Sequence, residues 1–186
     1  MFSEVTIELA KKQAIEITNI MRDCEYDEIC QCYEEFRERG YEFYTGLRRA
    51  CFIGRDFVLK VDTTAYTDCE REVKNYSLAK NVNLDCYFAE CDFLCEYCGV
   101  KFYIMEKCKV NSEASEEKIM DTFSNKIEAG YEADDLTPHL VAFGKDREEF
   151  NKLMDFLDDN DINDLHTGNI GVNSNGRYVF TDYAGY

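Results

Sequence analysis

Tryptophan, proline and positive charge are scarce in this sequence. The 186 residues include no Trp, one Pro and ten Gly, so few long irregular loops are expected. No apolar run is long enough to cross a membrane, and the chain does not open with the basic and then apolar pattern of a secretory signal. We therefore expect a cytoplasmic protein without a membrane partner.

Acidic residues outnumber basic ones. The chain carries 38 acidic and 21 basic residues, for a net charge of −17. A surface this acidic repels phosphate backbones, so nucleic acid is not an expected partner. The charge either serves solubility or lets the protein bind a basic face of another protein. A triphosphate could bind only where positive charge is concentrated locally or metal ions assist, because the overall field opposes it.

Hydrophobic residues make up 45% of the chain, which is enough for a folded core. Apolar periodicity predicts, in chain order, helices over 3–21 and 26–39, strands over 41–47, 49–53 and 57–61, a helix over 68–80, strands over 86–95 and 100–106, helices over 115–129 and 146–159, and strands over 170–172 and 178–181. Ser3 is expected to cap the first helix. Val73, Tyr76 and Ala79 or Lys80 are expected to share one face of helix 68–80. The order indicates a five-stranded sheet with one inserted helix, followed by a helical part.

A lysine on a predicted strand and a carboxylate on the next helix are the first candidates for a site. Lys60 lies in strand 57–61, and phosphoryl transfer needs a fixed cation on the phosphates that do not react. A lysine held in this way needs a carboxylate partner. The helix that follows offers Glu70 and Glu72. Residues 72–76 resemble the glutamate-bearing helix of bacterial kinase-like proteins, so we choose Glu72, with Glu70 as the alternative. Taken singly, each of these residues also fits an ordinary solvent-facing position.

The most specific motif lies near the end of the chain. Residues 164–169 read Asp-Leu-His-Thr-Gly-Asn, and Asp182 follows a predicted strand. One tight loop can present the side chains of Asp164 and Asn169 to the same phosphate. Together with the strand lysine and the helix glutamate, this order resembles the protein-kinase-like superfamily. The loop is similar to the catalytic loop of aminoglycoside-phosphotransferase-like kinases and of bacterial and phage kinase-like proteins.

The resemblance covers residues 40–186 and implies a minimal, bilobal kinase-like fold of the α+β class. Residues 40–108 would form an N-lobe with a five-stranded antiparallel sheet and one helix. Residues 109–186 would form a short helical C-lobe that ends just after the motif around Asp182. Residues 1–39 would be an N-terminal helical extension, which could brace the sheet or dock a partner.

The resemblance also implies that the protein binds ATP and Mg²⁺. Lys60 would hold the α and β phosphates, and Glu72 would orient Lys60. Asn169 and Asp182 would bind Mg²⁺. Asp164 would position the acceptor hydroxyl.

Further nucleotide contacts would come from the phosphate loop and from the hinge. In the phosphate loop Gly46 is the expected contact, although only Gly40 accompanies it, where the family often has three closely spaced glycines. In the hinge the backbone of Met105, Glu106 and Cys108 would bind adenine.

Three other features depart from the family pattern. Ile162 stands where the family has His, and Asn163 stands where kinases regulated by activation-loop phosphorylation have Arg, so that form of regulation is not expected. Ala184 takes the place of the glycine in the metal motif, with Gly185 next. The chain ends at Tyr186, before the activation segment and the helices that form the family's substrate platform.

Two functions from different classes fit this pattern. The first is an ATP- and Mg²⁺-dependent phosphotransferase that moves the γ-phosphate to a hydroxyl acceptor. A protein serine or threonine is favoured over a small molecule, because the subdomain that encloses small molecules is absent. The alternative is a catalytically weak kinase-fold binding or inhibitor protein that acts through its acidic surface. We weigh the phosphotransferase more heavily, because a pure scaffold has no physical need to keep all five site residues.

The ten cysteines support a third hypothesis, which carries less weight. Without an export signal, free thiols are the default. Cys91, Cys95 and Cys98 nevertheless have the spacing of the iron–sulfur motif of radical SAM enzymes, although they fall across a predicted hairpin. Zinc bound by Cys95 and Cys98 together with Cys30 and Cys32 is the other metal alternative.

Overall fold

The computed structural model describes residues 2–24, 29–46, 48–63, 66–110, 147–162 and 167–185. The chain forms two compact units, made of Met1–Lys74 with Glu90–Lys107 and of Asn75–Ala89 with Cys108–Tyr186. The predicted helix 115–129 and the loop residues 163–166 lie outside the described residues. In the ranges given, no helix has both the length and the apolar character to cross a membrane.

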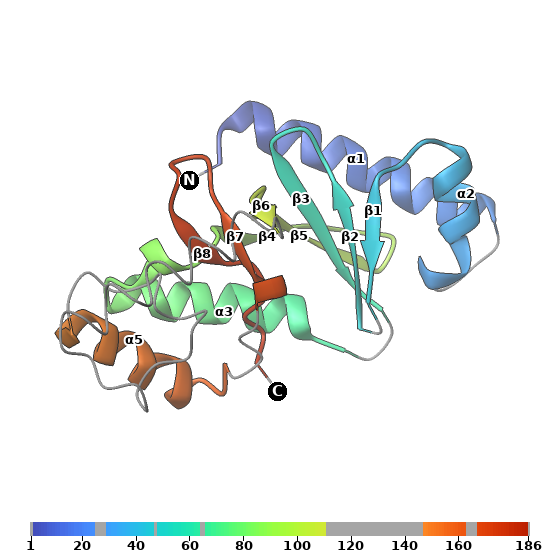
Figure 1. The fold of residues 1–186 in the computed structure, drawn as a ribbon. Coiled ribbons are helices and arrows are strands. Elements are labelled where there is room, and N and C mark those ends of the chain that lie inside the picture. Colours follow the sequence, from blue (N-terminus) through green and yellow to red (C-terminus); the bar gives the residue numbers. More distant parts are fainter. Residues whose placement is uncertain are drawn as a thin grey trace. The chain divides into compact units, whose positions relative to one another are not determined.

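The first unit is built on a five-stranded antiparallel sheet in the order β1-β2-β3-β5-β4 (Figure 1). Its strands are β1 (Phe43–Thr45), β2 (Arg49–Ile53), β3 (Phe57–Asp62), β4 (Cys91–Tyr97) and β5 (Val100–Glu106). The predicted α+β class and the five-stranded antiparallel sheet are confirmed. The strand predicted over 86–95 is wrong at its start, because residues Asp85–Tyr87 form a short 3₁₀ turn, η2.

One face of this sheet is apolar and is covered by helix α1 (Glu4–Asp23), which runs along the sheet in Figure 1. Side chains alternate along a strand, so every second residue of β2, β3 and β5 points to this face. The helix buries small and branched residues against it, among them Ala10, Ala14 and Ile17. Ser3 caps the helix as predicted, since its Oγ accepts a hydrogen bond from the Thr6 N–H at 3.1 Å. The helix α1 therefore braces the sheet.

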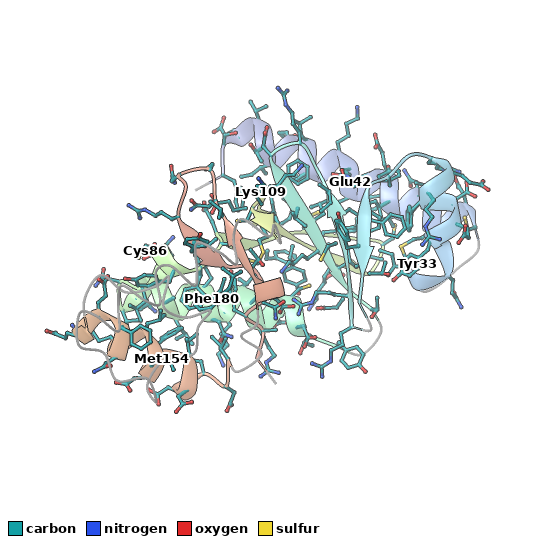
Figure 2. All side chains as sticks on the ribbon, viewed as in Figure 1. Tyr33, Glu42, Cys86, Lys109, Met154 and Phe180 are labelled. Atoms are coloured by element: carbon teal, nitrogen blue, oxygen red, sulfur yellow. The ribbon has the colours of Figure 1, made fainter. Side chains whose placement is uncertain are left out.

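An aromatic cluster closes the same core beside β1. One helix was predicted over residues 26–39. In the described part of this range the chain forms two short elements instead, η1 (Ile29–Cys32) and α2 (Tyr33–Glu38). The ring of Phe36 packs edge-on against Phe52 with centroids 5.0 Å apart. Tyr33, labelled in Figure 2, lies 5.4 Å from the ring of Phe43. These contacts tie the N-terminal elements to β1 and β2.

The second unit contains a three-stranded antiparallel sheet in the order β6-β7-β8. Its elements are β6 (Lys109–Val110), α5 (Arg147–Asp159), η5 (Thr167–Asn169), β7 (Ile170–Val172) and β8 (Tyr178–Phe180), with α3 (Asp68–Asn81) divided between the two units. The aromatic ring of Phe88 lies within 5.6 Å of the rings of Phe156, Phe180 and Tyr183. Phe180 is labelled in Figure 2. The terminal hairpin was predicted, whereas β6 was not.

Candidate functional site

A buried ion pair joins strand β3 to helix α3. Along β3, Leu59 and Val61 face the apolar core, so Lys60 between them points to the opposite face of the sheet. Its Nζ lies 2.9 Å from each carboxylate oxygen of Glu72. The side chain of Lys60 is 6% exposed and that of Glu72 is fully buried. The pairing expected from the sequence is therefore present in the first unit.

The structure also decides between the two glutamates of α3. The side chain of Glu70 is 61% exposed and its nearest cation is Lys101, at 3.7 Å. A solvent-exposed ion pair of this kind contributes little to the stability of the fold. Glu72, two residues later, is on the side of the helix that faces Lys60.

A second cation, which the sequence reasoning missed, contacts the same carboxylate. The Nη1 of Arg49 on β2 lies 2.7 Å from Oε1 of Glu72, and the Arg49 side chain is only 14% exposed. Antiparallel pairing of Cys51 with Lys60 puts Arg49, two residues before Cys51, on the same face of the sheet as Lys60. Alternation along β2 and β3 is the signal that could have found it.

The first turn of α3 is fixed by hydrogen bonds to the end of β3 and by an ion pair. Oδ1 of Asp62 accepts a hydrogen bond from the backbone N–H of Cys69 at 3.0 Å. Burial raises the pKa of Asp62, while its hydrogen bonds to Cys69 lower it. Arg48 lies 3.4 Å from the buried Asp68 and stacks over the ring of Tyr66. These contacts hold the helix that carries Glu72.

The residues proposed for nucleotide contacts in the loop and hinge have differing surroundings. The backbone N–H of Gly46 donates to the carbonyl of Arg49 at 2.9 Å and closes the β1–β2 hairpin. Met105 is buried at the end of β5. The N–H of Glu106 donates to the carbonyl of Glu90 at 2.7 Å. Cys108 is half-buried and belongs to the second unit. The roles of Gly46, Met105, Glu106 and Cys108 remain predictions.

Backbone pairing in the second unit puts Asn169 opposite Thr181, the residue before Asp182. Strand pairing sets Ile170 opposite Phe180, so Asn169 lies opposite Thr181. The Thr181 N–H donates to the Asn169 carbonyl at 2.8 Å. Asp182 follows directly and is half-buried, and Asn169 is buried. Amide and carboxylate oxygens are ligands that suit Mg²⁺, which is commonly held by one or two protein groups together with phosphates.

Two hydrogen bonds anchor the segment after Asp182. The hydroxyl of the buried Tyr183 donates to the carbonyl of Ala89 at 2.6 Å. The side-chain amide of Asn75 on α3 donates to the Tyr183 carbonyl at 2.8 Å. Asn75 is the second residue that the sequence reasoning missed. Because it lies one helical turn after Glu72, helical spacing is the signal that could have found it.

Gly185 supplies the backbone freedom that this segment needs. Its φ is +74°, and a Cβ at this position would collide with the backbone carbonyl of Asp161. Ala184 stands where the expected metal motif has glycine. It is buried, and its φ is not positive, so this position does not require glycine. The need for glycine therefore falls one position later than in the family pattern.

Asp164 and His166, which lie in the loop expected to be catalytic, are outside the described residues, as are Asn163 and Tyr186. The role predicted for Asp164 therefore remains a prediction.

The cysteines of the proposed cluster motif do not converge. A bulge in β4 between Phe93 and Cys95 changes which face each residue occupies. Cys91 pairs with Met105, whereas Cys95 pairs with Phe102 and packs against the core beneath α1. Cys98 is exposed in the turn. Within the described ranges, no three His, Cys, Asp or Glu side chains are grouped to hold a metal ion. The side chain of Cys30, needed for the zinc alternative, lies outside the description.

Comparison of the chain with protein-family models, with curated proteins and with solved structures finds no match.

Proposed function

We propose that the protein is an ATP- and Mg²⁺-dependent phosphotransferase of the protein-kinase-like superfamily, which moves the γ-phosphate of ATP to a hydroxyl group. The observation that carries the proposal is the buried pair of Lys60 and Glu72. Replacing a buried ion pair with apolar residues of similar volume is often neutral or stabilising, so such a pair is weak evidence for a role in stability. Ionisable groups that are buried at a cost are typical of functional sites.

The order of elements in the first unit supports the same proposal. The resemblance to the kinase-like N-lobe implies five antiparallel strands with one helix, and the first unit has five antiparallel strands with a helix following β3. The lysine is on β3 and its carboxylate is on that helix. The bilobal arrangement is part of the proposal.

Each proposed role fits the chemistry of its residue. Lys60 is a point cation fixed by Glu72, as needed for binding the α and β phosphates. Asn169 and Asp182 offer the oxygen ligands for Mg²⁺, which when bound would neutralise charge on the phosphates. Asp164 would orient the acceptor hydroxyl.

We propose a protein serine or threonine as the acceptor. A side-chain hydroxyl on a protein surface needs less enclosure than a small molecule. The net charge of −17 would favour acceptor segments rich in basic residues, because opposite charge raises the rate of encounter.

The same charge favours the second candidate, a kinase-fold protein that binds or inhibits a basic partner through its acidic surface. The two candidates differ in one respect that can be measured. The phosphotransferase transfers the γ-phosphate efficiently when a hydroxyl acceptor is supplied, whereas the catalytically weak binding protein transfers little or none even at saturating nucleotide.

Two substitutions test the assignment, with a third as the control. Asp182→Ala should abolish Mg-ATP binding, because it removes the only carboxylate proposed for the metal. Asp164→Ala should spare binding and remove transfer of labelled γ-phosphate to a basic serine-containing peptide. The control is Asp158→Ala, at an exposed position of α5, which should change neither. Retained Mg-ATP binding by Asp182→Ala would rule out the metal assignment, and equal turnover by Asp164→Ala would refute the role of Asp164.

A further inference from the structure

We propose that Arg49 is a second phosphate-binding residue, which together with Lys60 replaces the glycine-rich backbone cradle that this chain lacks. The inference rests on the proposed function and adds to it the way in which the triphosphate is bound. It assigns a guanidinium on β2 the role that backbone N–H groups have in a phosphate loop.

The first argument concerns the β1–β2 connection. A glycine-rich loop binds phosphate through backbone N–H groups that point at the ligand. In this hairpin the N–H of Gly46 is bonded to the carbonyl of Arg49. A Cβ at Gly46 would meet only that carbonyl, at 3.9 Å, so the glycine is not required there for a close approach. The Gly46 N–H is therefore already bonded within the hairpin, and a side-chain donor would take its place in binding phosphate.

The second argument is the position of the Arg49 side chain. Its Nη1 and the Nζ of Lys60 both contact Oε1 of Glu72, at 2.7 and 2.9 Å. Two cationic groups from neighbouring strands are thus held at a single carboxylate oxygen. A single glutamate with one lysine would suffice to orient that lysine, so the arginine needs its own explanation.

Two further carboxylates lie near this pair of cations. Asp68 pairs with Arg48. Asp62, opposite Arg49 in the strand register, accepts the N–H of Cys69 and also interacts electrostatically with Arg49. Like charges close together repel each other, most strongly where water is scarce. The cations of Arg49 and Lys60 repel each other in this way, and a polyphosphate that contacts both would offset their repulsion.

Guanidinium chemistry suits the role. Arginine has five N–H donors in a planar fork, so it can bond a carboxylate with one nitrogen and a phosphate with others. The guanidinium is also less strongly hydrated than an ammonium group, which favours it at sites where water is scarce. In an acidic protein, two adjacent cations provide the local positive charge that a triphosphate needs.

The test compares ligands with and without phosphates on the full chain. Binding of Mg-ATP and of adenosine is measured by titration calorimetry for wild type, Arg49→Gln and Arg55→Gln. Arg55 makes a matched control, because its exposed side chain lies in the neighbouring β2–β3 turn. Arg49→Gln should weaken Mg-ATP binding about 10-fold to 100-fold, as expected for loss of a charge-assisted contact, and leave adenosine binding nearly unchanged. Arg55→Gln should bind both ligands as wild type does.

Equal weakening of both ligands by Arg49→Gln would overturn the inference, because it would make Arg49 a purely structural residue. Unchanged Mg-ATP binding would overturn it as well. If circular dichroism shows that Arg49→Gln does not fold, Arg49→Lys decides. This variant keeps the charge but loses the fork, so Mg-ATP binding should weaken while adenosine binding does not, and wild-type affinity for Mg-ATP would refute the proposal. A wild-type chain that binds neither ligand would overturn the proposed function itself.

Discussion

The two faces of the five-stranded sheet are built from alternating residues of the same strands, yet they differ in kind. One face carries Phe52 and Leu59 and packs against α1 as a continuous apolar core. The other carries Arg49 and Lys60, which converge on Glu72. Leu59 on one face and Lys60 on the other are both buried, so burial alone does not separate the two faces. The difference is energetic. Burial of the apolar side chains favours folding, whereas burial of the charged side chains opposes it.

The apolar face is explained by stability and the charged face is not. Removing apolar area from water is favourable, at about 25 cal/mol per Å². Burying ions is unfavourable unless each ion is paired and hydrogen-bonded. We therefore expect substitutions on the apolar face to affect folding alone, and those on the charged face to affect binding as well.

The largest effect on stability is expected from Phe52→Ala. The ring is fully buried and contacts the rings of Phe36, Tyr41 and Phe43. Its removal should lower the free energy of unfolding by about 3–5 kcal/mol. Urea denaturation measures this value.

A phenylalanine on the other face provides the control. Phe93→Ala, at a position that is 46% exposed, should cost about 1 kcal/mol or less. The affinity of folded Phe52→Ala for Mg-ATP should match that of wild type. If it falls in proportion to the loss of stability, the two faces are not functionally distinct.

The next effect is expected from Glu72→Gln. The change leaves Lys60 and Arg49 without the shared negative charge, which should cost about 3 kcal/mol of stability. This value is at the lower end of the range for broken buried pairs, because glutamine keeps an acceptor oxygen. Unlike Phe52→Ala, this variant should also lose Mg-ATP binding.

Glu70→Gln on the same helix is the matched control, since its side chain is exposed. It should change the free energy of unfolding by no more than about 0.5 kcal/mol. Wild-type Mg-ATP affinity in Glu72→Gln would show that the buried pair does not serve the nucleotide.

A smaller effect, on the pH dependence of stability, is expected from Cys69, beside Glu72 on α3. Burial raises the pKa of this thiol well above its ordinary value, and the negative charges of Glu72 and Asp62 raise it further. Above about pH 8.5 the unfolded chain loses the thiol proton while the native protein keeps it. The native state then binds more protons, so stability falls as pH rises.

Cys69→Ala should remove this part of the alkaline destabilisation. Melting temperatures of both chains at pH 7, 9 and 10 test the expectation. As pH rises, the melting temperature of Cys69→Ala should increase relative to that of wild type. A constant difference would mean that the thiol titrates as it does in water.

Much of the fold follows from local patterns in the sequence. Strand 49–53 and helix 68–81 lie within one residue of their predicted bounds, because strand and helix periods are strong there. The start of β4 was misplaced because Phe88 and Ala89 belong to the core of the second unit, which periodicity cannot reveal. The two-residue strand β6 is too short to have a period.

The pair of Lys60 and Glu72 was predicted from the sequence, whereas Arg49 and Asn75 were missed. Val73, Tyr76 and Ala79 or Lys80 were expected to share one face of α3. Ala79 is buried, but Val73 and Tyr76 are only half-buried, and the polar Glu72 and Asn75 are buried together with Cys69. Contacts such as that of Asn75 with the Tyr183 carbonyl join residues far apart in the chain, which no local pattern encodes.

The most direct test of the central claim is the thermal stability of wild type and Lys60→Ala with and without Mg-ATP. A ligand that binds only the native state raises stability, by about 2.7 kcal/mol at 100 times its dissociation constant. For a chain of this length that corresponds to roughly 5–10 °C in melting temperature. We predict such a shift in wild type and none in Lys60→Ala. Equal shifts in both, or no shift in wild type at millimolar Mg-ATP, would contradict the account.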